Sequence, residues 1–149
     1  MSGRRTEQHQ YYMDFAPLLL YLVAVILRQA KCHSLCTSET VAEVDKLLKN
    51  LPKMKLYDCK LYTPTLNDYR QNCSKSMLEC FVKETTVLSA ETKERLKLLR
   101  MLKNLRRRLQ DRKPPCPVCE FYKEEKAETF LKTLVTILQA MNTMGNCSG

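Results

Sequence analysis

Four cysteines are the residues of this chain whose types and spacing could do chemistry. Cys116 and Cys119 form a Cys-x-x-Cys pair within "RKPPCPVCEFY", and Cys73 and Cys80 lie seven positions apart upstream. A Cys-x-x-Cys at the start of a helix can act as a redox pair with a lowered thiol pKa. Paired cysteines can also supply half of a zinc site. In the third interpretation, each member of the pair forms a disulfide with one upstream cysteine.

The redox and zinc interpretations find little support in the rest of the sequence. A thioredoxin-like redox site follows a βαβ pattern, and no stretch of this chain is predicted to be a strand. A zinc site needs four ligands in matched pairs, but Cys73 and Cys80 are seven apart and the histidines are His9 and His33. We therefore expect disulfides, with no metal and no other cofactor.

The spacing of the four cysteines also predicts how they pair. On one helix, Cys73 and Cys80 share a face and lie about 10.5 Å apart along the axis. Pro117 favours an extended conformation at Cys116, which places Cys119 roughly 10 Å further along the chain. The two spans match, so a segment parallel to the helix would be joined to it at both points. The expected disulfides are Cys73–Cys116 and Cys80–Cys119.

The N-terminus predicts an oxidising compartment, in which disulfides persist. Arg4 and Arg5 precede the 13-residue apolar run "FAPLLLYLVAVIL", which suits a signal-peptide core and falls short of the roughly 20 residues that span a bilayer. We expect residues 1–36 to be a signal peptide and leader, cleaved within 30–36, and residues 37–149 to be a secreted, extracellular domain. The alternative is an uncleaved anchor helix or a buried N-terminal helix.

The other cysteines and two glycosylation sequons give weaker signals. Cys59 and Cys147 remain inside the predicted domain, where they could form a third bridge. Cys32 and Cys36 either leave with the leader or pair with each other. The sequons are at Asn72 and Asn146, and each contains a cysteine that a disulfide would occupy.

Four amphipathic helices are predicted to position these residues. Apolar residues recur with helical spacing over about 39–51, 73–88, 96–109 and 127–141. Pro52 stops the first helix, Ser89 is expected to break the second, and Pro114 ends the third. The third helix should end near 104–109, because the crossover that follows must return along its length. Only 3 glycines in 149 residues argue against a turn-rich β fold.

The connections predict how the helices are arranged. The connection after the first helix has roughly 20 residues without a sustained period and is long enough to cross the fold, so the first two helices can run parallel. The short link at Ser89 makes the second and third helices antiparallel neighbours. The predicted fold class is therefore all-α: a short-chain four-helix bundle with up-up-down-down topology and two or three disulfides.

Several short motifs follow one another along this framework. They are "LYT" at 61–63, C-x6-C-F at 73–81, V-L-S-x-E at 87–91, C-x-x-C-E at 116–120, and "FL" at 130–131 leading to "ILQ" at 137–139. In their order and spacing they resemble the cytokines of the interleukin-2/15/21 group, nearest to interleukin-15, over roughly 41–143. "CPVC" followed by Tyr122 also resembles interleukin-21, so an interleukin-2 or interleukin-21 type is the alternative.

The resemblance implies a secreted, monomeric cytokine that binds receptor chains. An interleukin-15-like cytokine would bind an α receptor and assemble β and common γ chains, which triggers JAK–STAT signalling in lymphocytes. Such a ligand acts by binding alone and binds no nucleic acid. No Ser/His/Asp or paired-carboxylate pattern stands out in the sequence, so we expect no enzymatic activity.

The resemblance also implies which residues contact each receptor chain. The expected α-receptor contacts are Tyr62, Glu84, Glu91 and Glu120. An α receptor with basic residues would complement these carboxylates, although Glu84 and Glu91 could equally form an ordinary solvated face. Gln139 is the expected γ-chain contact. The expected β-chain contacts are Glu43, Asp45 and Asn104.

A net charge of +9 allows a function of a different class. The third helix and its end carry "RMLKNLRRRLQDRK" at 100–113, which would attract heparan sulfate or anionic lipid. Heparan sulfate binding as an accessory to cytokine action is one expectation. A cationic effector acting directly on membranes or polyanions is the alternative function, and it is disfavoured because the bundle core needs the apolar stripe of this helix.

Overall fold

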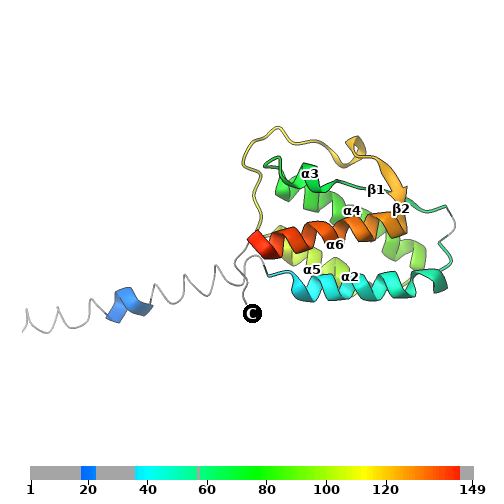
Figure 1. The fold of residues 1–149 in the computed structure, drawn as a ribbon, viewed down its shortest axis with the longest axis horizontal. Helices are drawn as coiled ribbons and strands as arrows, with labels where there is room; N and C mark the ends of the chain where they lie inside the picture. Colours follow the sequence, from blue (N-terminus) through cyan, green and yellow to red (C-terminus); the bar gives the residue numbers. More distant parts are fainter. Residues whose placement is uncertain (1–17, 23–35, 57, 145–149) are drawn as a thin grey trace, which may run out of the picture. The chain divides into compact units, whose positions relative to one another are not determined.

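The structure, a computed structural model, describes residues 18–22, 36–56 and 58–144 of the chain. The chain divides into two units, Met1–Ser34 and Leu35–Gly149. In the first unit, residues 18–22 form a short helical segment. The second unit contains four long helices, namely α2 (Ser38–Asn50), α4 (Ser74–Thr92), α5 (Lys97–Arg106) and α6 (Ala127–Met144) (Figure 1). Among the described residues, no helix is long and apolar enough to cross a membrane.

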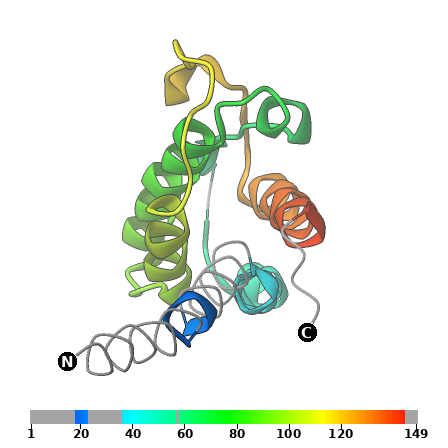
Figure 2. The same ribbon diagram turned by 90° about the vertical axis from the view of Figure 1, so that its left-hand side faces the viewer.

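The four long helices form an up-up-down-down bundle, which confirms the predicted fold class. The short turn between α4 and α5 makes them antiparallel. The link after α5 is bonded first to Cys73 and then to Cys80, so it runs in the same direction as α4. Helix α6, which follows this link, runs in the opposite direction. The start of α2 meets the end of α6, where the hydroxyl of Thr37 donates to the carbonyl of Leu138. Helix α2 is therefore antiparallel to α6 and parallel to α4 (Figures 1 and 2).

A shared apolar core explains why these helices pack together. Figure 2 shows α2, α6 and the α4–α5 pair around one interior. Phe81 of α4 meets Phe130 of α6 there, with ring centroids 5.2 Å apart. Helix α6 buries an apolar stripe, which comprises Phe130, Leu131, Leu134, Ile137, Leu138 and Met141. Burial of these stripes is the main stabilising contribution to such a bundle.

Helix α4 is longer than predicted, because Ser89 does not break it. The helix continues to Thr92 and ends at Lys93, whose φ of 58° is left-handed. The hydroxyl of Ser89 donates to the carbonyl of Glu94, so this serine stabilises the turn from within the helix. The stop was missed because left-handed helix ends favour glycine, and here the position is occupied by a lysine.

The first turn of α4 is held by the link that follows α5. Its N-cap residue, Cys73, makes no side-chain cap hydrogen bond. Instead, the carboxylate of Asp111 accepts hydrogen bonds from the backbone N–H of Ser76, at 3.0 Å, and from the Ser76 hydroxyl. A carboxylate is favourable at this positive end of the helix dipole, and α4 has no acidic residue in its own first turn. Asp111, which the sequence did not single out, therefore caps α4 from 35 positions away.

One short strand lies in the connection between α2 and α4, and a second lies in the connection between α5 and α6. The prediction that no strand forms was therefore wrong. Strand β1 (Lys60–Tyr62) pairs antiparallel with β2 (Glu124–Lys126), and Leu61 lies opposite Glu125. Strands of three residues are too short to show the alternating pattern by which strands are predicted. Their pairing depends on contact between segments that are far apart in the sequence.

The connection after α2 contains two further elements that the sequence analysis treated as irregular chain. A 3-10 turn covers Leu51–Lys53, and a short helix, α3, covers Leu66–Tyr69. Helix α3 begins with a capping box in which Thr65 and Asp68 satisfy each other's backbone N–H groups. These elements shorten the irregular part of the connection, within which β1 packs against α4.

Candidate functional site

Two disulfides fasten the CPVC segment to α4. They are Cys73–Cys116, with Cα atoms 5.8 Å apart, and Cys80–Cys119, with Cα atoms 5.0 Å apart. These are the pairs that the spacing of the cysteines predicts. Because each CPVC sulfur is bonded to α4, the two cannot form a redox pair with each other. Asp111 lies near the first bridge, but disulfide sulfurs are not the thiolates that bind metals.

One of the two further bridges that the sequence allowed is not formed. Cys59 is a free, half-buried thiol, so it makes no bridge to Cys147. Cys147 and Cys32 lie outside the described residues, and Cys36 is disulfide-bonded. Burial raises the pKa of the Cys59 thiol, and the carboxylates of Glu91 and Glu84 raise it further. Cys59 therefore lies beside the acidic side of α4.

The sequon at Asn72 lies in the turn before α4. Asn72 is half-buried with a left-handed φ of 66°, and its carbonyl accepts a hydrogen bond from the backbone N–H of Arg112 at 2.8 Å. Glycosylation there stays a prediction. Asn146 lies outside the described residues.

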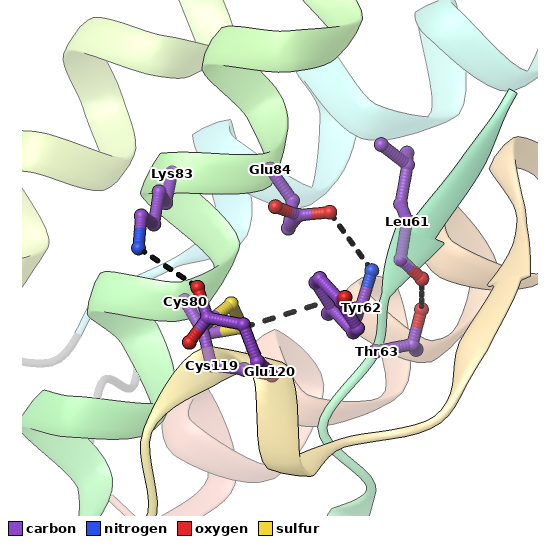
Figure 3. The surroundings of a disulfide bond; sticks show 8 residues. All are labelled: Leu61, Tyr62, Thr63, Cys80, Lys83, Glu84, Cys119 and Glu120. Atoms are coloured by element: carbon purple, nitrogen blue, oxygen red, sulfur yellow. Dashed lines mark hydrogen bonds and ion pairs between the residues drawn. A yellow bond between two sulfur atoms is a disulfide. The ribbon is translucent and has the colours of Figure 1, made fainter.

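The Cys80–Cys119 bridge gathers residues from three separate segments on one side of α4 (Figure 3). The sulfur of Cys80 lies 3.9 Å from the carbonyl oxygen of Tyr62 in β1. Lys83 of α4 forms an ion pair with Glu120, which directly follows Cys119, at 3.2 Å. The structure therefore brings Tyr62 and Glu120, two of the expected α-receptor contacts, to the same bridge.

Glu84 lies at the same place but is buried, with 7% of its surface exposed. Its carboxylate accepts the backbone N–H of Tyr62 at 2.8 Å and so holds β1 against α4 (Figure 3). Burial raises the pKa of Glu84, while the hydrogen bond from Tyr62 and the ammonium group of Lys83 oppose the rise. The interpretation of Glu84 as part of a solvated face is wrong, because its carboxylate turns toward β1. This geometry makes Glu84 a residue that positions Tyr62.

Apart from Lys83, whose exposed ammonium group pairs with Glu120, the accessible groups described at this site are anionic or aromatic. Glu91 and Glu120 are exposed, and Tyr62 is half-buried. A hydrogen bond from its own backbone and the ion pair with Lys83 lower the pKa of Glu120, so this carboxylate is charged at neutral pH. The carboxylate of Glu124 is the largest cause of a raised pKa at the Tyr62 phenol. The surface thus offers negative charge around one aromatic ring.

Helical spacing extends the site along α4. Cys80, Glu84, Val87 and Glu91 follow one another at steps of four, three and four residues, so they lie on one stripe of the helix. Val87, between the two glutamates, is 42% exposed. The sequence analysis missed it as a site residue, although its spacing from Glu84 and Glu91 was a usable signal.

Two more apolar residues lie beside Glu120, in the CPVC segment. Val118 and Phe121 are 68% and 72% exposed. Exposed apolar groups that adjoin one another commonly mark a binding surface. No periodicity could have revealed them, since their exposure depends on how the bridge holds the segment. We call Tyr62, Val87, Glu91, Val118, Glu120 and Phe121 together the acidic face.

The residues expected to contact the β and γ chains lie on the other long helices. Gln139 on α6, Asn104 on α5 and Asp45 on α2 are exposed, and Glu43 on α2 is half-buried. Glu43 and Asp45 are two positions apart, so they lie about 200° apart around the helix. They therefore flank the buried stripe of α2 on opposite sides and do not form one patch.

Comparisons with known proteins agree with the fold and the motifs. The family model for Interleukin 15 matches residues 19–142, which is most of the 149-residue chain. No curated protein and no solved structure matches it. The matched range contains all four long helices almost completely, together with the disulfides Cys73–Cys116 and Cys80–Cys119. The chain belongs to the interleukin-15 family and is an interleukin-15-like cytokine.

Proposed function

We propose that this cytokine is secreted, binds an α receptor through its acidic face, and assembles β and common γ receptor chains to trigger JAK–STAT signalling in lymphocytes. Family membership supports receptor binding as its activity and favours the interleukin-15 type over the interleukin-2 and interleukin-21 types. The α-receptor assignment depends on one observation: the Cys80–Cys119 bridge brings Tyr62 and Glu120 together beside α4.

The acidic face has the composition of a protein–protein interface. Glu91 and Glu120 would steer a basic receptor surface toward the face and fix its orientation. Val87 and Phe121 would supply the apolar contact that interface centres contain. The ion pair of Lys83 with Glu120 is exposed at the surface, with side-chain exposures of 65% and 55%. An exposed pair of this kind is weak, so a receptor cation could replace Lys83 at little cost.

The other receptor chains would bind through the remaining helices. Helix α2 packs against α5, so Asp45 and Asn104 come from neighbouring helices, which suits contact with one β chain. Glu43 and Asp45 lie on opposite flanks of α2, so a single β chain would contact one of them centrally and the other only at its edge. Gln139 is exposed near the end of α6, where it is available to the γ chain.

A membrane-active effector is the less favoured function. An interfacial helix must present an apolar face to the lipid. On α5, Leu98 and Leu102 are fully buried and Leu105 is 7% exposed. The basic helix would therefore have to leave the bundle before it could insert.

Surface binding of the oxidised protein to a soluble interleukin-15-type α receptor tests the proposal. Glu91→Lys and Glu120→Lys should each weaken binding by about tenfold or more, because attraction becomes repulsion. Glu79→Lys is the matched control, since Glu79 is exposed on α4 but lies off the stripe. Glu84→Lys is unsuitable because it buries an unpaired charge. Absence of binding by the folded protein, or equal losses in all three variants, would refute the α-receptor assignment.

A further inference from the structure

A cationic pocket lies where α4 turns into α5. Its volume is about 530 Å³, within the range of small-ligand sites. The lining consists of Ser89, Arg95, Leu96, Lys97, Leu99, Arg100 and Lys103. Four of these residues are cationic and none is acidic, so the pocket has the charge of an anion-binding site.

The four cations of the pocket are available to a ligand. Arg95, Lys97, Arg100 and Lys103 are all exposed, and none takes part in an ion pair within the described part of the chain. Glu94 lies in the same turn but does not line the pocket. Neighbouring like charges repel one another, and an anion between them would relieve this repulsion.

Helix α5 arranges part of this charge in a row. Arg100, Lys103 and Arg107 lie on the side of α5 that faces away from its buried leucines. At 1.5 Å per residue, the helix extends the charge from Lys97 over about 15 Å. The half-buried side chains of Leu96 and Leu99 add an apolar part to the pocket lining. A pocket that opens onto a row of cations suits an extended, repeating polyanion better than a single small anion.

We infer that this pocket binds a sulfated polysaccharide of the heparan sulfate type, with sulfate groups on Arg95, Arg100 and Lys103 and the chain continuing along α5. An anionic membrane would also be attracted to the charge, but membrane binding by a helix draws on an exposed apolar face. The apolar face of α5 is buried in the core. A sulfated sugar chain requires only the cations and the open pocket.

The pocket is a better site than the basic run at 106–113, where the sequence concentrates its positive charge. Within that run, the carboxylate of Asp111 caps α4 and adds negative charge. The backbone of Arg112 is fastened to Asn72. The cations that line the pocket come from the turn before α5 and from α5 up to Lys103, and not from the run that follows.

The polysaccharide site and the acidic face lie on opposite sides of α4. Ser89 follows Cys80 by nine residues, which is about two and a half helical turns. Ser89 therefore faces away from the stripe that carries Cys80 and Glu91. A bound polysaccharide should leave the α-receptor site free, and the inference does not depend on the receptor proposal.

Binding of the full oxidised protein to a heparin octasaccharide tests this inference. The variant Arg95→Gln/Arg100→Gln/Lys103→Gln removes three of the four positive charges that line the pocket. Lys75→Gln/Arg112→Gln/Lys113→Gln removes the same charge at the other end of α4 and is the matched control. We expect the pocket variant to bind about tenfold more weakly or worse, with a shallower salt dependence because fewer counterions are released. The control should lose less than about threefold, and both variants should keep α-receptor binding.

Three results would overturn the inference. Equal losses in the two triple variants would mean that only net charge matters. Failure of the wild-type protein to bind the octasaccharide would exclude the site. Tighter binding to phosphatidylserine vesicles than to the octasaccharide would identify the surface as membrane-binding. If the pocket variant misfolds, Lys103→Gln against Lys113→Gln decides, with about a threefold loss expected only for the first.

Discussion

The acidic face has a closed end and an open end, although α4 contributes to both. At the closed end, the Cys80–Cys119 bridge, strand β1 and the buried Glu84 hold one another. At the open end, Glu91 is exposed in the last turns of α4. Two glutamates on one helical stripe thus have opposite environments. The carboxylate of Glu84 is structural because β1 crosses the helix there, whereas the side chain of Glu91 is exposed and free to bind although Cys59 lies near it.

The largest expected effect comes from opening the closed end. Cys80→Ser with Cys119→Ser should lower the free energy of unfolding by about 2–5 kcal/mol, measured by chemical denaturation. It should also abolish α-receptor binding, because Tyr62 and Glu120 lose their common anchor. Cys59→Ser replaces a thiol that is in no bridge and should cost less than about 1 kcal/mol. Wild-type stability in the double variant would show that the bridge does not hold this end.

Truncation of Glu84 at the closed end should lower the free energy of unfolding more than truncation of Glu91 at the open end. Glu84→Ala leaves the buried N–H of Tyr62 without its acceptor, which should cost about 1–3 kcal/mol of unfolding free energy. Glu91→Ala, at an exposed position, should stay within about 0.5 kcal/mol of wild type. Denaturation of both variants under the same conditions checks the difference. Equal losses would mean that the open end is as structural as the closed one.

The closed end should also respond to pH. Burial raises the pKa of Glu84 in the folded state above the ordinary value of 4.5, so between these two values the folded protein holds more protons on Glu84 than the unfolded chain does. The stability contributed by Glu84 should therefore fall as pH rises through this window and remain constant above it.

Comparison with Glu84→Gln isolates this pH effect, since the amide does not titrate. Wild type should be more stable relative to the variant near pH 4 than near pH 7, as measured by denaturation at each pH. A constant difference would show that Glu84 has an ordinary pKa.

The smallest effect on stability is expected for Tyr62→Phe. The phenol is at the surface, where the nearby carboxylate of Glu124 raises its pKa, and its removal should leave the denaturation midpoint unchanged. α-Receptor affinity should fall severalfold, because a central aromatic contact loses its polar group. Receptor titration of the variant measures the loss of affinity. A variant that is destabilised but binds with full affinity would mean that the Tyr62 phenol stabilises the fold and does not contact the receptor.

The open parts of the molecule could be predicted from the sequence, because local spacing decides them. The apolar stripe from Phe130 to Met141 is sufficient to place α6 and to leave Gln139 on its exposed side. The Cys73–Cys116 pair was likewise predicted, because the distance from Cys73 to Cys80 matches that from Cys116 to Cys119 and the segment after the third helix runs parallel to the second helix. For α6 the residues that matter lie within one element, and for both cysteine pairs the prediction needs only the matching spans of two short segments.

Apart from the Cys80–Cys119 bridge, the closed end could not be predicted, because contacts between distant segments decide it. Glu84 is buried only because β1 presents a backbone N–H to it from 22 positions earlier. Asp111 caps α4 across 35 positions. The exposure of Phe121 depends on the Cys80–Cys119 bridge that holds its segment. A glutamate, an aspartate and a phenylalanine in such stretches have no periodic pattern that distinguishes these roles.

The most direct test of the two-ended face compares Glu84→Gln and Glu91→Gln, with α-receptor affinity and unfolding free energy measured for each. We predict that Glu91→Gln weakens binding by about tenfold and leaves stability unchanged. Glu84→Gln should bind like wild type, because its amide oxygen can still accept the N–H of Tyr62. If Glu84→Gln instead loses affinity at unchanged stability while Glu91→Gln binds normally, the buried carboxylate is itself the receptor contact and the division between the ends is wrong.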